Sequence, residues 1–436
     1  MEVPRVLRFM TINVWYTAGG PTYAARLAGL RRWIAAVQPD VLALQEVLRD
    51  ASLPACSVTQ LSARGTLKVA SSGGENVANG GSGGGSGGSD GGGVSDGGSD
   101  ASLPRAPYDQ SHELLEGLGF TAVAYGAASA FWGNHSRVIG NAIASRHPIL
   151  SADRLGLPST AGDWEARGGS GSSKGEEAAA LVDTPAPNGL TPTTGAWVPP
   201  VAAPPRPAEH RAAVSAVIAT PAGTLAVTTT HLNWQLHDSL VRQAQVVALD
   251  AWATARGRVA ATAAAAAAVV PAGAAPALAG GGPRGPFPSV LLGDFNAEPA
   301  STELRFLRGH ATIGGASTAW TDAWEAARRS SPAVVAAAAT DGGETYVPSA
   351  NPAAALEAEP DRRLDYIWVA PPAGDGRGGV LRSRVVCDWP DAEGVYPSDH
   401  YGVVADLRAE PVQGLAAERR RLGWSHVSPH PGEGGV

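Results

Sequence analysis

The amino-acid sequence predicts a two-sheet α/β sandwich. At least eight short runs rich in Val, Ile and Leu are bounded by Gly, Pro, Asn or Asp, which is the pattern of β-strands. Helical patterns are interspersed with these runs, and no sequence repeat is present. A closed barrel fits less well, because pairs such as 213–220 and 225–232 are close enough in sequence to form hairpins.

The helices are recognised by their apolar spacing and by their stop signals. In 23–37, Leu27, Leu30, Ile34 and Val37 recur every three or four residues, and Gln-Pro-Asp ends the helix at 38–40. Further helices are expected at 239–255 and 302–307. The expected strands are 5–13, 41–46, 141–145, 213–220, 225–232, 289–294, 365–369 and 402–407.

Composition indicates one interrupted domain rather than several. The chain has 436 residues with 55 Gly and 34 Pro, concentrated in stretches with few large apolar side chains, which cannot offset the entropy of ordering. Without these stretches about 270 residues remain, enough for one large α/β domain. We therefore expect one domain over 1–411 and a C-terminal tail over 412–436. The insertions are expected at about 55–104, 161–208, 256–288, 330–342 and 370–379.

Charge and cysteine content restrict the partners and the compartment. The formal net charge of −7 gives no basic field for coating nucleic acid, although an enzyme acting on a nucleotide or phosphodiester remains compatible with it. Two cysteines, Cys56 and Cys387, are too few for a disulfide framework. No signal peptide or membrane-length apolar run is visible. We expect an intracellular, cytoplasmic protein, most simply a monomer.

Polar side chains recur where the expected strands begin or end. Singly, each has a structural explanation, because Asn and Asp form turns and a lone His is more often structural than catalytic. Five such ends, in addition to the strand end at Asp294 and Asn296, are better explained by a shared site, since strand ends converge in layered α/β folds. The residues are Asn13, Gln45, Glu46, His231, Asn233, Asp294, Asn296, Asp365, Asp399 and His400.

These residue types favour hydrolysis of a phosphate ester. Oxygen ligands from Glu46 and Asp399, with Asn13 nearby, suit Mg²⁺ or Mn²⁺, which bind through few carboxylates and substrate phosphate oxygens. No Cys/His cluster in the sequence supports zinc. Two histidines beside carboxylates supply acid/base capacity near neutral pH. Together they favour in-line attack of an activated water.

The motifs also resemble a known family. TINVW, LALQEV, GNAIASRHPI, TTTHLNW, LLGDFNAEP, RRLDYIWV and PSDHYGV look like the endonuclease/exonuclease/phosphatase superfamily, in that family's order and over nearly all of the non-inserted sequence. The resemblance implies a DNase I-like fold, a four-layer sandwich of two packed mixed β-sheets flanked by helices. The long Gly/Ser and Ala/Pro insertions depart from the family pattern and fall between the motifs.

The resemblance implies roles for the residues at the metal and at the scissile phosphate. Glu46 is then the principal metal ligand, Asp399 a second carboxylate near the metal, and Asn13 a contact to metal or phosphate. His231 matches the position that touches the scissile phosphate and helps to stabilise or protonate it.

It also implies roles around the attacking water. Asp294 activates or orients the water and Asn296 positions it beside the phosphate. Asp365 holds the imidazole of His400, which hydrogen-bonds a phosphoryl oxygen.

Three further residues are expected to bind substrate. Arg211 and Asn141 have structural explanations of about equal weight. Asn233 lies in a segment with Trp234, His237 and Asp238 that either lines a leaving-group pocket or caps the following helix.

The expected function is that of a divalent-metal-dependent phosphodiesterase of EC class 3.1 acting on a phosphate ester. The alternatives are a nuclease on DNA or RNA, a sphingomyelinase-like enzyme, an inositol-phosphate phosphatase, or a catalytically inactive binding scaffold. A small or lipid-derived diester is slightly preferred to nucleic acid.

Overall fold

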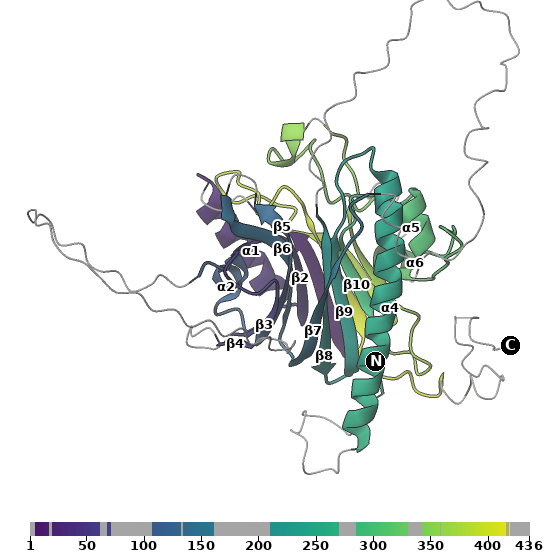
Figure 1. Cartoon of the computed structure of the whole chain (residues 1–436). Coiled ribbons are helices and arrows are strands. Elements are labelled where there is room, and N and C mark those ends of the chain that lie inside the picture. Colours follow the sequence, from purple (N-terminus) through teal and green to yellow (C-terminus); the bar gives the residue numbers. More distant parts are fainter. Residues whose placement is uncertain are drawn as a thin grey trace, which may run out of the picture.

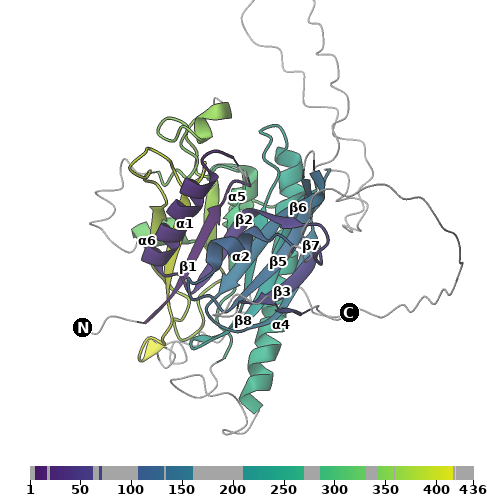
Figure 2. The ribbon, with the colours of Figure 1, turned by 90° about the vertical axis from the view of Figure 1, so that its left-hand side faces the viewer.

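Two β-sheets pack face to face in the computed structural model, with helices on both outer faces (Figures 1 and 2). The predicted four-layer α/β sandwich is therefore confirmed, and it contains a parallel and several antiparallel strand pairs in each sheet. The structure describes residues 5–16, 20–61, 68–70, 107–131, 134–160, 210–269, 285–329, 342–357, 359–415 and 418.

The first sheet, sheet A, has eight strands and carries both the first and the last described strand. At one edge of sheet A, β13 pairs with β14, and β14 pairs in turn with β1. Its order is β13 (Val380–Val386), β14 (Gly402–Arg408), β1 (Val6–Asn13), β2 (Val41–Asp50), β6 (Asn134–Ser145), β5 (Ala122–Phe131), β3 (Cys56–Gln60) and β4 (Lys68–Ala70).

The second sheet, sheet B, has six strands, and the predicted hairpin of β8 and β9 lies within it. Its order is β11 (Thr321–Asp322), β12 (Asp365–Val369), β10 (Val290–Asp294), β9 (Gly223–His231), β8 (Ala212–Thr220) and β7 (Ile149–Gly156).

Helices cover the outer faces of the two sheets (Figure 1). Helix α1 (Tyr23–Val37) connects the parallel strands β1 and β2, and α4 (Ser239–Val269) lies between the parallel strands β9 and β10 in the chain. The remaining helices are α2 (Gln110–Leu115), α5 (Thr302–Leu307), α6 (Ala323–Arg329), and a 3-10 helix (Ala354–Glu357). Within the described residues no helix has the length and apolar character needed to cross a membrane.

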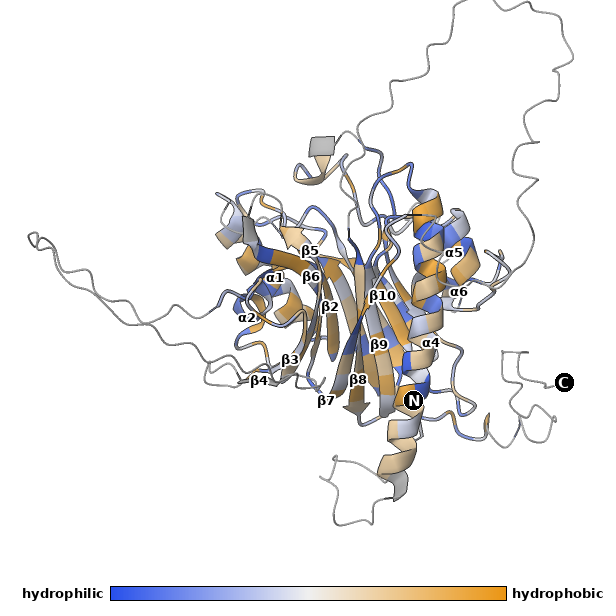
Figure 3. Ribbon diagram, viewed as in Figure 1, coloured by the Kyte–Doolittle hydropathy of each residue, from blue (hydrophilic) through white to orange (hydrophobic). Residues whose placement is uncertain are grey.

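Every second side chain of a strand points into the space between the sheets and helps to fill it. In β1, Leu7 and Phe9 pack in the cluster between the sheets, while Met10 and Ile12 pack in the cluster beneath α1. Figure 3 shows hydrophobic residues along the strands of both sheets. Because the period of a strand is two, residue 13 falls on the same face as Leu7 and Phe9, at the end of β1.

Ordered structure extends into three segments that we expected to be insertions. Helix α4 continues to residue 269 instead of ending at 255, because alanine has the highest helix propensity and Ala260 and Ala264 are buried. Residues 56–60 form β3. In 370–379, Arg377 donates to the carbonyls of Ala222 and Gly285. The expected insertion at 161–208, all but the last residue of the one at 330–342, and the tail beyond 418 lie outside the described residues.

Candidate active site

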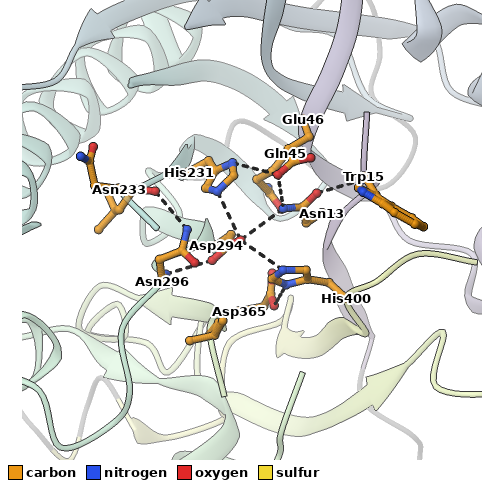
Figure 4. Close-up of polar contacts among 12 residues, drawn as sticks. Asn13, Trp15, Gln45, Glu46, His231, Asn233, Asp294, Asn296, Asp365 and His400 are labelled. Carbon is orange, nitrogen blue, oxygen red and sulfur yellow. Dashed lines mark hydrogen bonds and ion pairs between the residues drawn. The ribbon is translucent and has the colours of Figure 1, made fainter. Parts of the chain in front are cut away.

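The site lies at one end of the sandwich, where polar side chains follow the apolar ones that several strands direct between the sheets. Figure 4 shows the contacts among these polar residues. His231 on β9 is the register partner of Asp294 on β10, and Asp294 is the partner of Asp365 on β12. On sheet A, Asn13 of β1 is the partner of Gln45 of β2. The two sheets thus each present a row of polar side chains to the same space.

The turn after β10 needs glycine at its start. Gly293 has φ +140°, and a Cβ there would lie 2.2 Å from the carbonyl oxygen of Thr230. Asp294 Oδ1 accepts from the backbone N–H of Asn296 (2.9 Å), and Asn296 Nδ2 donates to Leu232 O (3.0 Å). These bonds fix the turn and leave the other carboxylate oxygen of Asp294 facing the site.

A β-bulge places Glu46 in the site. The register between β2 and β6 shifts between Leu44 and Val47, so Gln45 and Glu46 together oppose the single residue Asn141. Glu46 has φ +60°, an unusual conformation for a residue with a side chain. The extra residue breaks the alternation of β2, and the Glu46 carboxylate is presented at the site instead of packing beneath α1.

Asn13 holds the carboxylates through its amide nitrogen. Its Nδ2 donates to Glu46 Oε1 (3.1 Å) and to Asp294 Oδ2 (3.2 Å), while its Oδ1 accepts from the N–H of Trp15 (3.0 Å). Because that N–H requires an oxygen acceptor, the orientation of the amide is determined. In this arrangement Asn13 orients the two carboxylates, and its role as a metal ligand stays a prediction.

His400 and Asp365 form a buried imidazole–carboxylate pair. His400 Nδ1 lies 2.9 Å from Asp365 Oδ2, and His400 Nε2 lies 3.7 Å from Asp294 Oδ2. Burial by itself lowers the pKa of His400, but the carboxylates of Asp365 and Asp294 outweigh it and hold that pKa well above its ordinary value. The ring of Tyr346 packs 5.2 Å from the His400 ring. His400 is therefore favoured in its charged form.

The pKa of His231 is shifted in the opposite direction, downward. Its Nε2 lies 3.5 Å from Asp294 Oδ2 and its Nδ1 lies 3.8 Å from Glu46 Oε1. Burial lowers the pKa of His231 well below its ordinary value, and the positive charges of Arg211 and His400 lower it further. A neutral and a charged imidazole thus stand on two sides of one carboxylate.

Burial disfavours the ionised form of three carboxylates at the site. Burial is the largest cause that raises the pKa of Glu46, and it raises the pKa of both Asp294 and Asp399 to about 6. A set of buried and half-buried oxygen donors whose ionisation is penalised by desolvation fits a hard divalent cation. The ligand atoms of Asp294, Asp365 and His400 also lie within 4.8 Å of one another, which is a spacing compatible with a metal.

Residues that the sequence did not single out hold the carboxylates in place. Ser398 Oγ lies 3.0 Å from Asp399 Oδ1 and donates to Asn13 O (2.7 Å). Asn351 Nδ2 donates to Ser398 O (2.8 Å). Thr345 Oγ1 accepts from the N–H of Asp365 (3.1 Å). Thr345 and Asn351 come from 342–357, where no strand or helix pattern draws attention to them.

The three residues expected to bind substrate have different surroundings. Arg211 lines the pocket. Asn141 also lines it, but its Nδ2 donates to Ala212 O (2.7 Å), so the amide connects the two sheets. Asn233 does not line the pocket, and its amide bonds the side chains of Gln245 and Asp238 (2.8 and 3.1 Å), whereas its neighbour Trp234 does line the pocket.

A pocket of about 390 Å³ opens over these groups. Arg211 and Arg362 at its walls add positive charge around the carboxylates. Aromatic rings form much of the rest of the wall, and they belong to Trp15, Tyr16, Phe131, Trp234 and Tyr346. The pocket therefore offers carboxylates at its floor and flat apolar surfaces beside them.

A four-layer α/β sandwich with carboxylates and imidazoles at one end of its two sheets defines the DNase I-like class of fold. The model of the endonuclease/exonuclease/phosphatase family matches residues 10–400. The chain belongs to this family, and the resemblance drawn from its motifs is confirmed. This family belongs to a superfamily of phosphate-ester hydrolases.

Solved structures provide further similarities. An endonuclease/exonuclease/phosphatase from Beutenbergia cavernae DSM 12333 is 18% identical, over 93% of this chain and 72% of that chain, with a TM-score of 0.43. The human Nocturnin catalytic domain is 14% identical (93% and 96%, TM-score 0.45). D. rerio TDP2 in complex with a single-strand DNA product is 14% identical (92% and 98%, TM-score 0.45). No curated protein matches the chain.

Proposed function

We propose that this protein is a divalent-metal-dependent phosphodiesterase that hydrolyses its substrate by in-line attack of water. One observation carries the proposal: Asp294 Oδ2 lies within 3.7 Å of His231 and His400, in a pocket that also contains Glu46 and Asp399. This combination of carboxylates and imidazoles is suited to activating water and stabilising a phosphoryl group.

Glu46 and Asp399 would hold Mg²⁺ or Mn²⁺. We prefer them to the Asp294–Asp365–His400 group, because His400 and Asp365 are already engaged with each other through Nδ1 and Oδ2 at 2.9 Å. When bound, the cation supplies Lewis-acid polarisation of a phosphoryl oxygen.

Each of the remaining side chains has its own role in the proposed reaction. Asp294 accepts a proton from the attacking water, which Asn296 helps to place. Charged His400, held by Asp365, donates a hydrogen bond to a phosphoryl oxygen and stabilises the charge that builds up there. Neutral His231 faces the same space and is placed to assist the leaving group. Arg211 adds a positive charge for an anionic substrate.

The test uses purified full-length protein with Mg²⁺ or Mn²⁺ against single-stranded DNA, RNA, sphingomyelin, inositol phosphates and a chromogenic diester. We expect turnover of at least one substrate, abolished by a chelator. Glu46→Gln and His400→Ala are expected to lower kcat by about 10²–10⁴-fold. Glu393→Gln, an exposed residue outside this pocket, is the matched control. Equal turnover in all three variants contradicts the proposal, and absence of both turnover and Mn²⁺ binding favours an inactive scaffold.

A further inference from the structure

Gln45 precedes Glu46 in the chain, and its side chain extends into the interface between the two sheets (Figure 4). The residue is fully buried. Its Nε2 lies 2.9 Å from Oγ1 of Thr229 on β9 and 3.1 Å from Oγ1 of Thr11 on β1. The Thr11 hydroxyl also lies 3.3 Å from Gln45 Oε1. One amide thus joins three strands and both sheets.

Its surroundings make this polar cluster unusual. Phe9, Ala43 and Val227 occupy the same inward faces of β1, β2 and β9, two residues before Thr11, Gln45 and Thr229, and all three belong to the apolar core. A buried amide is costly unless it is hydrogen-bonded, and an apolar side chain of similar volume would fill the space. The cluster therefore calls for an explanation other than packing.

The position of the cluster supplies one. The site is divided between the sheets: Glu46 and Asn13 come from sheet A, and His231 and Asp294 from sheet B. Apolar contacts are non-directional and do not by themselves fix how the sheets are registered against each other. The bond from Gln45 to Thr229 is directional, and it lies one residue from Glu46 and two residues from His231.

The bulge gives the same region a second bond between the sheets. Asn141, the single residue opposite Gln45 and Glu46, donates to Ala212 O on β8 at 2.7 Å. Glu46 itself has φ +60°, a conformation that persists only where its surroundings enforce it. Hydrogen bonds to sheet B therefore come from both strands of the bulge: from Gln45, next to the strained Glu46 on β2, and from Asn141, opposite it on β6.

We propose that Gln45 is a positioning residue: with Thr11 and Thr229 it sets the Glu46 carboxylate against His231 and thereby the affinity of the site for a divalent cation. The inference rests on the proposed function, because it concerns the same cation site. It assigns Gln45 no contact with substrate.

The decisive variant removes the polar cluster without leaving a part of it unpaired. Thr11→Val, Gln45→Leu and Thr229→Val are combined in the full-length chain, so that no hydroxyl or amide loses its partner. Urea unfolding measures stability, and isothermal titration with Mn²⁺ measures the dissociation constant. We expect stability close to that of the unmodified protein and an increase in the Mn²⁺ dissociation constant of about 10–100-fold, as for residues that orient metal ligands.

A matched control comes from the other face of sheet B. The buried hydroxyls of Thr228 and Ser215 lie 3.1 Å apart and join β9 to β8 within that sheet. Thr228→Val with Ser215→Ala removes a similar polar pair that does not connect the sheets. Its Mn²⁺ affinity is expected to be unchanged. Equal loss of affinity in this control overturns the inference, as does unchanged affinity in the triple variant.

Single substitutions keep the test decisive if the triple variant does not fold. Thr229→Val is expected to weaken Mn²⁺ binding, whereas Thr229→Ser, which retains the hydroxyl, is expected to preserve it. Equal Mn²⁺ affinities of these two variants overturn the role of the Gln45 cluster. If the unmodified protein neither binds Mn²⁺ nor hydrolyses any diester, the proposed function itself fails, and this inference with it.

Discussion

His231 and His400 lie on two sides of the same carboxylate oxygen, Oδ2 of Asp294, at 3.5 and 3.7 Å. Their pKa values are shifted in opposite directions, down for His231 and up for His400. Near neutral pH, the site therefore favours one neutral and one charged imidazole. A reaction that consumes a proton at one position and releases it at another needs such a difference.

Asp365→Asn tests the origin of the charge on His400. Loss of the carboxylate removes the main group that raises the pKa of His400, and burial then favours the neutral ring. We expect kcat to fall by about 10²–10⁴-fold, and the alkaline limb of the pH–rate profile to move to lower pH. A chromogenic diester assay from pH 5 to 9 measures both. Asp361→Asn, which removes a carboxylate bonded to Ser349, is the control, and an unshifted profile in Asp365→Asn contradicts the assignment.

Gly293→Ala tests the turn that presents Asp294. The added methyl meets the Thr230 carbonyl, and φ +140° is strained for any side chain. A loss of about 1–3 kcal/mol in the free energy of unfolding is expected from backbone strain, with the clash adding to it. Urea unfolding measures the loss. Gly117→Ala, at φ +74° with no atom within 4 Å, is the control and should lose clearly less.

Asp399→Asn tests the link between pH and stability in the metal-free protein. Folding raises the pKa of Asp399 to about 6, so its protonated form is favoured by the fold. Its contribution to stability is fully present below the ordinary pKa near 4 and is lost as the pH rises through about 6. With a chelator present, the variant should therefore gain stability relative to the unmodified protein between pH 4 and 7.

Thermal unfolding at several pH values, with chelator and then with Mn²⁺, measures this difference. Mn²⁺ should stabilise the unmodified protein at pH 7 and the variant much less, because under the proposed function the cation binds the folded state through this carboxylate. A stability difference that does not change with pH contradicts the prediction.

Asn351→Ala tests the support beneath Asp399. The substitution leaves the buried carbonyl of Ser398 without its donor, which costs about 1–3 kcal/mol. We expect lower stability, together with a fall in kcat because the Ser398–Asp399 backbone is no longer held. Asn351→Asp should be worse than Asn351→Ala, since a carboxylate repels the carbonyl oxygen. Equal kcat in both variants and the unmodified protein contradicts the positioning role.

Much of the fold is visible in local patterns. The helix predicted at 23–37 and the strand predicted at 365–369 have the same bounds in the structure, because their apolar spacing and stop signals are local. Strands β5 and β7 were missed, since β5 is rich in Ala, Gly and Ser and β7 carries polar residues. Their pairing with β6 and β8 stabilises them in spite of weak intrinsic preference.

The residues of the candidate site could be predicted from the sequence, but the orientations of their side chains could not. Strand ends revealed Glu46, Asp294 and His400. Which atom of Asn13 faces the carboxylates, and whether Asn233 caps a helix or meets substrate, depends on partners distant in sequence. The role of Gln45 depends on Thr229, a residue of the opposite sheet, and no local pattern encodes that contact.

The pairing of β1 with β14 joins Val6 to Arg408, two positions separated by almost the whole described chain. During synthesis, β1 can pair with β2 early, but its pairing with β14 must wait until the ribosome has made the chain beyond His400, which lies two residues before β14. Under the proposed function, growing chains that stop short of that point lack His400 and are expected to show no hydrolytic activity even if much of sheet B has already folded. The time at which activity appears during synthesis would therefore report when the sandwich is complete.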